Sequence, residues 1–338
     1  MRRREFILGS IAAGSFIAGC SFIDLSKKGG ESMNVAEGEP KMESNPDGRV
    51  YLIRTSNRKE GVERLMNEFD LSDLRGKLVA VKANYNSADR FPASTHPETL
   101  ESILEILKKY TDSIILAERS GMGDTERVLE EMGAKEISNR YGAETIVLDR
   151  ETEWVRFDAD HWKNGFLFAG AFYRADHIIQ TCCLKTHRFG GHFTLSLKNS
   201  VGMVARYWNG HDYMAELHRS PNQRKMIAEI NIAYSPFLVI MDAIEGFSEG
   251  GPDKGKLIRP ELLIAGRDRV AVDAVGVALL RIHGTIPEVS RGDVFDQEQI
   301  KRAAELGIGV SSPEEIEIIS LNTEAEEISE KIRAELGD

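Results

Sequence analysis

Short apolar runs alternate with amphipathic segments along most of this chain, and this alternation constrains the fold more than any other feature. Runs such as "KLVAVKAN" (77–84), "SIILAE" (113–118) and "FLVIMDAI" (237–244) are largely apolar. Strands of this kind are buried on both faces, as in parallel sheets. Between them, segments such as "HPETLESILEILKKY" (96–110) have apolar residues at helical spacing. The sequence therefore predicts an α/β fold with a largely parallel sheet and helices on both faces.

The same reasoning places further elements along the chain. Helices are expected near 59–69, 124–133 and 297–306, with a charged helix after them. Further strands are expected at 50–54, 144–149, 177–185, 261–266 and 316–321.

The N-terminal residues differ from the rest. Residues 1–19 carry three arginines followed by a short apolar run of small residues, which is the layout of a signal peptide and is too short to span a bilayer. "RREFIL" resembles the twin-arginine export motif, and "IAGC" resembles a lipoprotein box in which Cys20 is lipidated. A buried or amphipathic helix is the alternative. We expect removal of 1–19, export by the twin-arginine pathway, and membrane attachment through Cys20 at the periplasmic or extracytoplasmic face.

Residues 20–48 are polar and rich in Gly, Ser, Glu and Asn, which favours a flexible tether. Residues 49–338 are long enough to form one large α/β domain, which we expect, with two closely joined domains as the alternative. The formal net charge is −11, and because residues 1–19 contribute +2 (three Arg, one Glu), the exported chain would carry −13. This charge argues against nucleic acid as a partner.

Four of the predicted strands end in polar or glycine-rich segments. These segments are "VKANYNSADRF", "AERSGMGDTE", "CCLKTHRFGGH" and "MDAIEGFSEGGPDKG". Because ligands bind at the carboxyl ends of strands in open α/β sheets, we expect the four to meet around one site. The first two contribute the candidate ligand-binding residues Lys82, Asn84, Ser120 and Gly121.

The third segment and the residues after it are basic within an acidic protein. Lys185, His187, Arg188 and Lys198 cluster here, followed by Asn199. Such a pocket suits a small carboxylate or phosphate held by the two lysines, with the asparagine as a neutral donor. The histidine is the candidate for proton transfer, because its pKa lies near working pH. A solvated basic rim is the alternative.

Four acidic residues and a glycine loop leave alternatives open. Asp242 and Glu245 are candidates for binding a divalent metal or positioning the ligand, whereas a turn cap would explain the first equally well. The loop "GMGDT" lacks a full dinucleotide fingerprint and favours a tight turn with an Asp or Thr cap. Asp268 follows a strand and is expected to cap a helix. Asp273 lies in an apolar run and needs a partner, either structural or functional.

Cys182 and Cys183 are adjacent in a predicted strand. Their Cα atoms lie about 3.8 Å apart, so a bridge between them would be strained, and their side chains point to opposite faces. We interpret them as buried core thiols, with a thiol redox switch as the alternative. They are the only cysteines besides Cys20, so the chain cannot hold a four-cysteine iron–sulfur cluster, and the spacing of a Cys/His zinc site is missing.

Several motifs in order resemble one known family. "VKAN", "THPETL", "CLKTH", "TLSLKNSVGMV", "MIAEIN", "VIMDAIEGFSEGGP" and "IAGRDRVAVDAVGVALLR" together resemble the domain of unknown function 362 family over about residues 51–285. The resemblance implies no settled reaction. Related chains often occur near iron–sulfur proteins or carry fused ferredoxin modules, whose cysteine runs this chain lacks. The motif residues correspond to Lys82, Asn84, Lys185, His187, Lys198, Asn199, Asp242, Glu245, Asp268 and Asp273.

Two functions are compatible with these observations. The chain is either an enzyme or cofactor-dependent protein acting on a small anion at the strand ends, with a divalent metal as one option, or a non-catalytic lipoprotein that delivers a ligand or serves an iron–sulfur or other redox partner.

Overall fold

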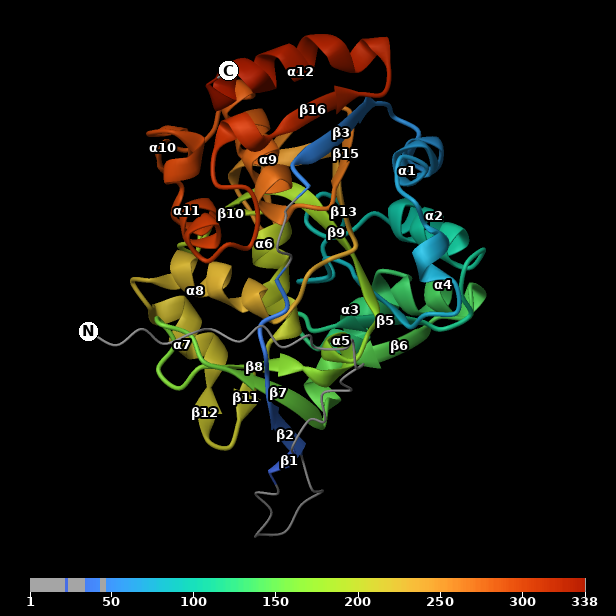
Figure 1. Cartoon of the computed structure of the whole chain (residues 1–338), viewed down its shortest axis with the longest axis vertical. Coiled ribbons are helices and arrows are strands. Elements are labelled where there is room, and N and C mark those ends of the chain that lie inside the picture. Colours follow the sequence, from blue (N-terminus) through green and yellow to red (C-terminus); the bar gives the residue numbers. More distant parts are fainter. Residues whose placement is uncertain (1–21, 24–33, 43–46, 338) are drawn as a thin grey trace, which may run out of the picture.

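A long sheet forms the centre of the molecule in the computed structural model, which describes residues 22–23, 34–42 and 47–337 (Figure 1). Within these residues it contains ten strands. Eight of them follow in the order β16 (Glu317–Ser320), β3 (Arg49–Arg54), β15 (Leu262–Gly266), β13 (Leu238–Gly250), β9 (His177–His187), β4 (Val79–Lys82), β5 (Ile114–Glu118) and β6 (Glu144–Val147), while β10 (His192–Thr194) pairs with β9 and β14 (Gly255–Ile258) with β13.

Most neighbouring strands on this path are parallel, which confirms the predicted fold class. β13, β9, β4, β5 and β6 run in one direction, and β16 is parallel to β3. The exception is β15, which is antiparallel to both β13 and β3. The chain returns from β13 through the short strand β14 without a crossover helix, and such a connection allows only antiparallel pairing.

The order of the strands reverses between β4 and β9. The chain proceeds from β4 to β5 and β6 toward one edge, whereas β9 and then β13 extend the sheet toward the other edge. In open α/β sheets a crevice opens at the carboxyl ends of the two strands where this reversal occurs. The topology therefore selects the ends of β4 and β9 as the place for a site.

Helices cover both faces of the sheet because its strands are apolar on both sides. Alternate residues of β3 enter two different cores: Val50 and Leu52 lie in one, Tyr51 and Ile53 in the other. The helices α1 (Arg58–Met66), α2 (Pro97–Leu107), α3 (Thr125–Glu131) and α4 (Ala134–Arg140) contribute to the second core. On the opposite face lie α9 (Arg269–Ile282), α10 (Pro287–Ser290), α11 (Glu298–Glu305) and α12 (Thr323–Leu336).

A second, four-stranded sheet in the described residues packs on that opposite face. Its order is β1 (Phe22–Ile23), β2 (Asn34–Glu37), β7 (Glu153–Phe157) and β8 (Phe166–Ala169). β2 lies in the stretch expected to be a flexible tether, and this expectation is wrong for residues 34–42. Ala36 is buried, and the amide of Lys41 donates to the carbonyl of Ile232 at 2.9 Å. Strand pairing satisfies the backbone of this polar segment, which has no hydrophobic pattern that would predict a strand.

The segment between β9 and β13 folds into short elements that cover one end of the sheet. They are α6 (Ser196–Asn199), the 3₁₀ turn at Ser200–Met203, the hairpin β11 (Tyr207–Trp208) and β12 (His211–Asp212), α7 (Tyr213–Arg219) and α8 (Gln223–Ile230). α5 (Gly170–Tyr173) follows β8.

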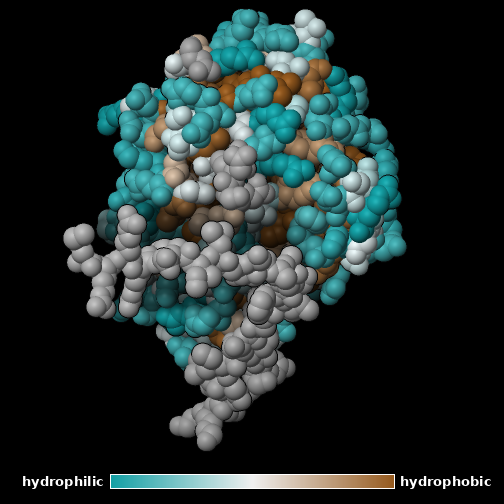
Figure 2. All heavy atoms as spheres, in the orientation of Figure 1, coloured by the Kyte–Doolittle hydropathy of each residue, from teal (hydrophilic) through white to brown (hydrophobic). Residues whose placement is uncertain are grey.

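The surface in Figure 2 is mainly hydrophilic over the described residues, with apolar side chains showing in smaller areas between the elements. Among the described residues, no helix has both the length and the apolar composition needed to cross a membrane. The predicted signal peptide (1–19) and Cys20 lie outside the described residues.

Candidate functional site

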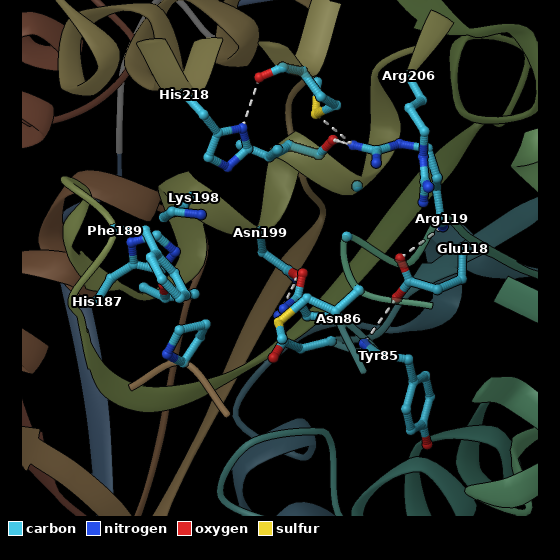
Figure 3. A pocket seen from close by; sticks show the side chains of 18 of the residues that line it. Tyr85, Asn86, Glu118, Arg119, His187, Phe189, Lys198, Asn199, Arg206 and His218 are labelled. Carbon is cyan, nitrogen blue, oxygen red and sulfur yellow. Dashed lines mark hydrogen bonds between the residues drawn. The ribbon is translucent and has the colours of Figure 1, made fainter. Parts of the chain in front are cut away.

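A cavity of about 470 Å³ lies at the carboxyl ends of β4, β5 and β9, where the strand order reverses (Figure 3). Three of the four predicted segments supply several of its residues, and the segment after β9 closes it from above the strand ends. The residues that line it are Lys82, Asn84, Tyr85, Asn86, Glu118, Arg119, Gly121, Met122, Lys185, His187, Phe189, Thr194, Lys198, Asn199, Val201, Gly202, Arg206, Asp212, Met214, Ala215, His218 and Pro252.

Two fully buried lysines form the floor of the cavity. Lys82 Nζ lies 2.7 Å from Glu118 Oε1 and donates to Asn199 Oδ1 at 3.2 Å. Lys185 Nζ donates to Asn84 Oδ1 at 2.7 Å and also to the carbonyl of Ala93. Burial lowers the pKa of both lysines, and for Lys82 the carboxylate of Glu118 opposes this shift. Each of these ammonium groups already has partners within the protein.

Two asparagines join these lysines in one hydrogen-bonded network. Asn84 Nδ2 donates to Asn199 Oδ1 at 3.1 Å, and Asn199 Nδ2 donates to the carbonyl of Thr181 at 3.0 Å. Each amide oxygen faces a lysine, so the orientation of both amides follows from their partners. The network holds the end of β4 against α6.

A buried carboxylate on α9 fixes the position of α6. Asp273 accepts hydrogen bonds from the backbone N–H groups of Ser196 at 2.7 Å and Leu197 at 3.0 Å, and also from the Ser196 hydroxyl. Burial raises the pKa of Asp273 to about 7, while these hydrogen bonds oppose the shift. Asp273 thus fills the structural role considered for it, and it directs Lys198 and Asn199 into the cavity.

Lys198 differs from the other two lysines. Its side chain is largely buried, with the residue 9% exposed, yet within the described part of the chain its Nζ has no hydrogen-bond or ion-pair partner. Burial and the positive charges of Lys185 and Arg119 lower the pKa of Lys198 to about 7. A substantial fraction of this amine is therefore uncharged at neutral pH.

Two histidines lie on either side of Lys198 (Figure 3). His187 Nδ1 accepts from the backbone N–H of Gly191 at 3.3 Å, and His218 Nδ1 lies 2.7 Å from the carbonyl of Met214. Burial lowers the pKa of both imidazoles, and the charge of Lys198 adds to this effect, so both rings are neutral at pH 7. Their bonding partners then place a hydrogen on Nε2 of His187 and a lone pair on Nε2 of His218.

The lining is predominantly basic. Five of its residues are lysines or arginines and two carry carboxylates, namely Lys82, Arg119, Lys185, Lys198 and Arg206 against Glu118 and Asp212. Asp212 caps α7 by accepting from the amide of Ala215 at 2.8 Å, and Glu118 pairs with Lys82. In a chain of net charge −11, this local excess of positive charge creates a site suited to an anion.

Some predicted residues have other roles. Ser120 is buried and donates from Oγ to the carbonyl of Tyr85 at 2.7 Å, whereas Gly121 does line the cavity. The glycine loop forms the expected turn, with Asp124 capping α3 by accepting from Arg127 N at 2.9 Å. Arg188 pairs with Asp253 at 2.6 Å and does not belong to the lining.

The predicted metal ligands lie away from the cavity, which corrects the expected convergence of four strand ends. Asp242 is buried between Arg58 Nε at 2.8 Å and Thr99 Oγ1 at 2.6 Å, and Glu245 pairs with Arg259 at 2.9 Å. β13 continues to Gly250, so Asp242 lies within the strand, paired with Cys183 of β9, and a register shift after it sets residues 243–245 outside this ladder. Only Pro252, further along this segment, reaches the cavity.

The residues present do not favour a metal centre at this place. Among the described residues, no three or more His, Cys, Asp or Glu side chains form a group suited to a metal ion. Ca²⁺ and Mg²⁺ need several oxygen ligands, whereas Asp242 is already paired with Arg58 and most charged side chains of the cavity are cations.

Two further predictions from single residues are confirmed. Asp268 caps α9, accepting from Val270 N at 2.7 Å and Ala271 N at 3.1 Å. Cys182 and Cys183 are buried and unbridged, and burial raises the pKa of both thiols, that of Cys183 to about 12. Such thiols are unreactive, which supports their interpretation as core residues.

Sequence reasoning missed the residues that complete the cavity. Glu118 and Arg119 end β5, and the signal was the charged pair that terminates the apolar run "SIILAER". Arg206, Met214 and His218 come from the hairpin and α7, where nothing in the spacing predicted a position beside β9.

Comparisons with known proteins identify a family. A search of curated proteins found no match. Among solved structures, the chain is similar to the lactate racemase apoprotein from Thermoanaerobacterium thermosaccharolyticum, with 15% sequence identity and a TM-score of 0.41 over 77% of this chain; the match spans 63% of that protein's length. The family model described as Domain of unknown function (DUF362) matches residues 79–278, which is more than half of the chain and includes every residue lining the cavity. The chain therefore belongs to the DUF362 family.

Proposed function

We propose that this protein is an enzyme that binds a small anionic substrate in the cavity and transfers a proton there. One observation carries the proposal: Lys198 ends in a cavity rich in cations without a hydrogen-bond or ion-pair partner among the described residues. Keeping such a lysine costs stability, and a bound anion would remove that cost. Lys82 and Lys185 serve the fold of the site, because protein groups already accept from them.

The chemistry available is general acid–base catalysis. Lys198 has a pKa of about 7, so it can accept or give up a proton at neutral pH. His187 offers an N–H group and His218 offers a lone pair, as their other ring nitrogens are occupied by Gly191 and Met214. A substrate between them would meet one donor and one acceptor. Within the proton transfer predicted for His187, this arrangement assigns it the part of a hydrogen-bond donor.

Ligand-dependent thermal stabilisation tests the anion site. Inorganic phosphate and a panel of small mono- and dicarboxylates should raise the melting temperature of the wild-type protein. Lys198→Ala should lose this response, whereas Lys301→Ala, which removes an exposed lysine of α11 paired with Asp296, should keep it. Equal stabilisation of both variants would refute the proposal.

We also infer that the chain is exported and attached to a membrane. The support is in the sequence alone: the arginines at 2–4, the apolar run after them and Cys20. Replacement of Arg2, Arg3 and Arg4 by lysine should abolish export, and Cys20→Ser should release the exported protein from the membrane fraction. Retention of the serine variant in that fraction would contradict lipidation. A redox partner outside the cytoplasm stays a prediction.

A further inference from the structure

We infer that the substrate is a carbonyl compound bearing a carboxylate or phosphate group, and that Lys198 forms an imine with its carbonyl carbon. This inference rests on the proposed function, because it places a specific covalent step in the same cavity.

The backbone of Lys198 is fixed in position, and its side chain is closely packed. Asp273 fixes the first turn of α6, so the lysine backbone cannot shift freely. Gly191 packs closely against the side chain: a Cβ atom at this glycine would lie 2.9 Å from Lys198 Cε and 2.8 Å from His187 Nδ1. The Lys198 side chain thus lies beside the His187 imidazole. Any residue larger than glycine at position 191 would clash with both side chains.

The electrostatic surroundings favour the uncharged form of the Lys198 amine. A protonated lysine has no lone pair with which to attack a carbonyl, and an ordinary exposed lysine is almost entirely protonated at pH 7. Burial and the nearby charges of Lys185 and Arg119 favour the neutral form of Lys198. Neither carboxylate of the described lining restores the charge, because Glu118 is paired with Lys82 and Asp212 caps α7.

The two histidines match the proton movements of imine formation. The lone pair of Lys198 Nζ forms the bond to the carbonyl carbon as the C=O π bond breaks, while His187 Nε2–H donates a hydrogen bond to the oxygen and keeps its hydrogen. His218 Nε2 accepts a proton from the nitrogen and passes it to the oxygen, which gives a neutral carbinolamine. The nitrogen lone pair then forms the C=N bond as the C–O bond breaks. His218 carries the second nitrogen proton to the oxygen by the same route, and the oxygen leaves as water. Both hydrogens of the neutral amine are found in the water, so neither reactant is oxidised or reduced.

The rest of the cavity explains why the carbonyl compound would be an anion. In Figure 3, Arg119 and Arg206 lie across the cavity from Lys198 and the histidines. Arg119 donates from Nε to the carbonyl of Val204 at 2.8 Å and from its other two nitrogens to the carbonyls of Ser120 and Val201. Arg206 donates to the carbonyl of Ser120 and lies 3.6 Å from Asp149. Both guanidinium groups are thereby fixed in position, and it is their positive charge that favours a carboxylate or phosphate at this side of the cavity.

Reductive trapping tests the imine. The full-length protein is incubated with 2-oxobutanoate and sodium cyanoborohydride, and the adducts are located by peptide mass mapping. Because half of an amine with a pKa near 7 is uncharged at pH 7, whereas about one in a thousand exposed lysines is, we expect about ten-fold or more labelling of Lys198 over any exposed lysine. Labelling spread evenly over exposed lysines would overturn the inference.

Control variants and a ligand without a carbonyl distinguish failure of the imine inference from failure of the anion-binding proposal. Lys198→Arg should abolish the major adduct, and Lys301→Arg should retain it. Butanoate, which has the carboxylate and no carbonyl, should compete with the trapping. If butanoate stabilises the wild-type protein but 2-oxobutanoate gives no adduct at Lys198, the imine is refuted and anion binding stands. If neither compound stabilises or labels the protein and phosphate also has no effect, both proposals fail.

The pH dependence of trapping in the wild-type protein tests the inference without any variant that could misfold. The rate of trapping at Lys198 should rise as the pH passes through about 7, whereas labelling of exposed lysines should rise only toward their usual pKa. A single common pH dependence for all lysines would also refute the inference.

Discussion

Replacing Lys198 by methionine should make the fold more stable near neutral pH, although it removes the residue on which the proposed activity depends. In the folded chain, burial together with Lys185 and Arg119 lowers the pKa of Lys198 from its usual 10.5 to about 7. His187 and His218 also face the amine. At pH 7 this difference corresponds to an upper limit of about 4 kcal/mol lost from the free energy of unfolding. Because Lys198 is 9% exposed and the effective dielectric constant at such sites lies well above that of a dry interior, we expect about half of this, roughly 2 kcal/mol.

The stability gained by Lys198→Met should decrease as the pH rises. Below pH 7 the lysine is protonated in both states, and the full cost is present. Between pH 7 and 10.5 the unfolded chain still holds the proton that the folded chain has released, so the stability of the wild type rises with pH. The advantage of Lys198→Met over the wild type should therefore shrink by more than half between about pH 6.5 and pH 9.5.

Urea unfolding followed by tryptophan fluorescence measures this difference at each pH. Comparing variant with wild type cancels the titration of all other groups that the substitution leaves unchanged. Lys301→Met is the matched control, because its ammonium is exposed, and it should show no comparable pH-dependent gain. A Lys198→Met variant that is less stable than the wild type at pH 6.5, or a difference that stays constant with pH, would refute the reasoning.

Three further substitutions or treatments address the residues outside the cavity. Asp242→Ala should lower the free energy of unfolding by about 3 kcal/mol, since Arg58 would lose its buried partner; a stoichiometric metal present in the wild type and lost in this variant, detected by elemental analysis, would contradict the structural role. Asp268→Ala should cost about 2 kcal/mol in urea unfolding, because the cap of α9 would be lost, and should leave anion binding intact. Cys182 and Cys183 should stay unlabelled by a thiol reagent in the native protein and react in urea; rapid native labelling would instead support a redox switch.

The sequence was most informative for features that depend on one local pattern, such as a buried strand, a strand end or a helix cap. Continuous apolar runs predicted the central strands, and β9 begins at His177 as expected. Strand ends then predicted that Lys82, Asn84 and Lys185 would meet, because a parallel sheet brings its carboxyl ends to one edge. The cap at Asp268 followed from its place between a strand and a helix.

The predictions failed for residues whose positions depend on contacts between distant parts of the chain. β13 continues past Asp242 to Gly250, so Asp242 lies inside the strand and not at its end, and nothing in the apolar pattern of "FLVIMDAI" marks this continuation or the register shift that follows. His218 reaches the cavity only because α7 folds back over β9, and Glu118 was overlooked because a buried charge in a strand is understood only once Lys82 is seen beside it. Asn34–Glu37 forms a strand by pairing with β7, a partner distant in sequence.

The network that joins β4 to α6 has a consequence for how the protein matures. Asn84 and Asn199 are 115 residues apart in the chain, and Lys185 reaches Asn84 across 101 residues. Neither wall of the cavity exists until both halves of the sheet have docked, so no partly folded intermediate would offer the site to a ligand. Occupancy of the cavity would then report that folding is complete and would stabilise the finished state by mass action. A ligand of this cavity would therefore bind the fully folded chain and none of its precursors.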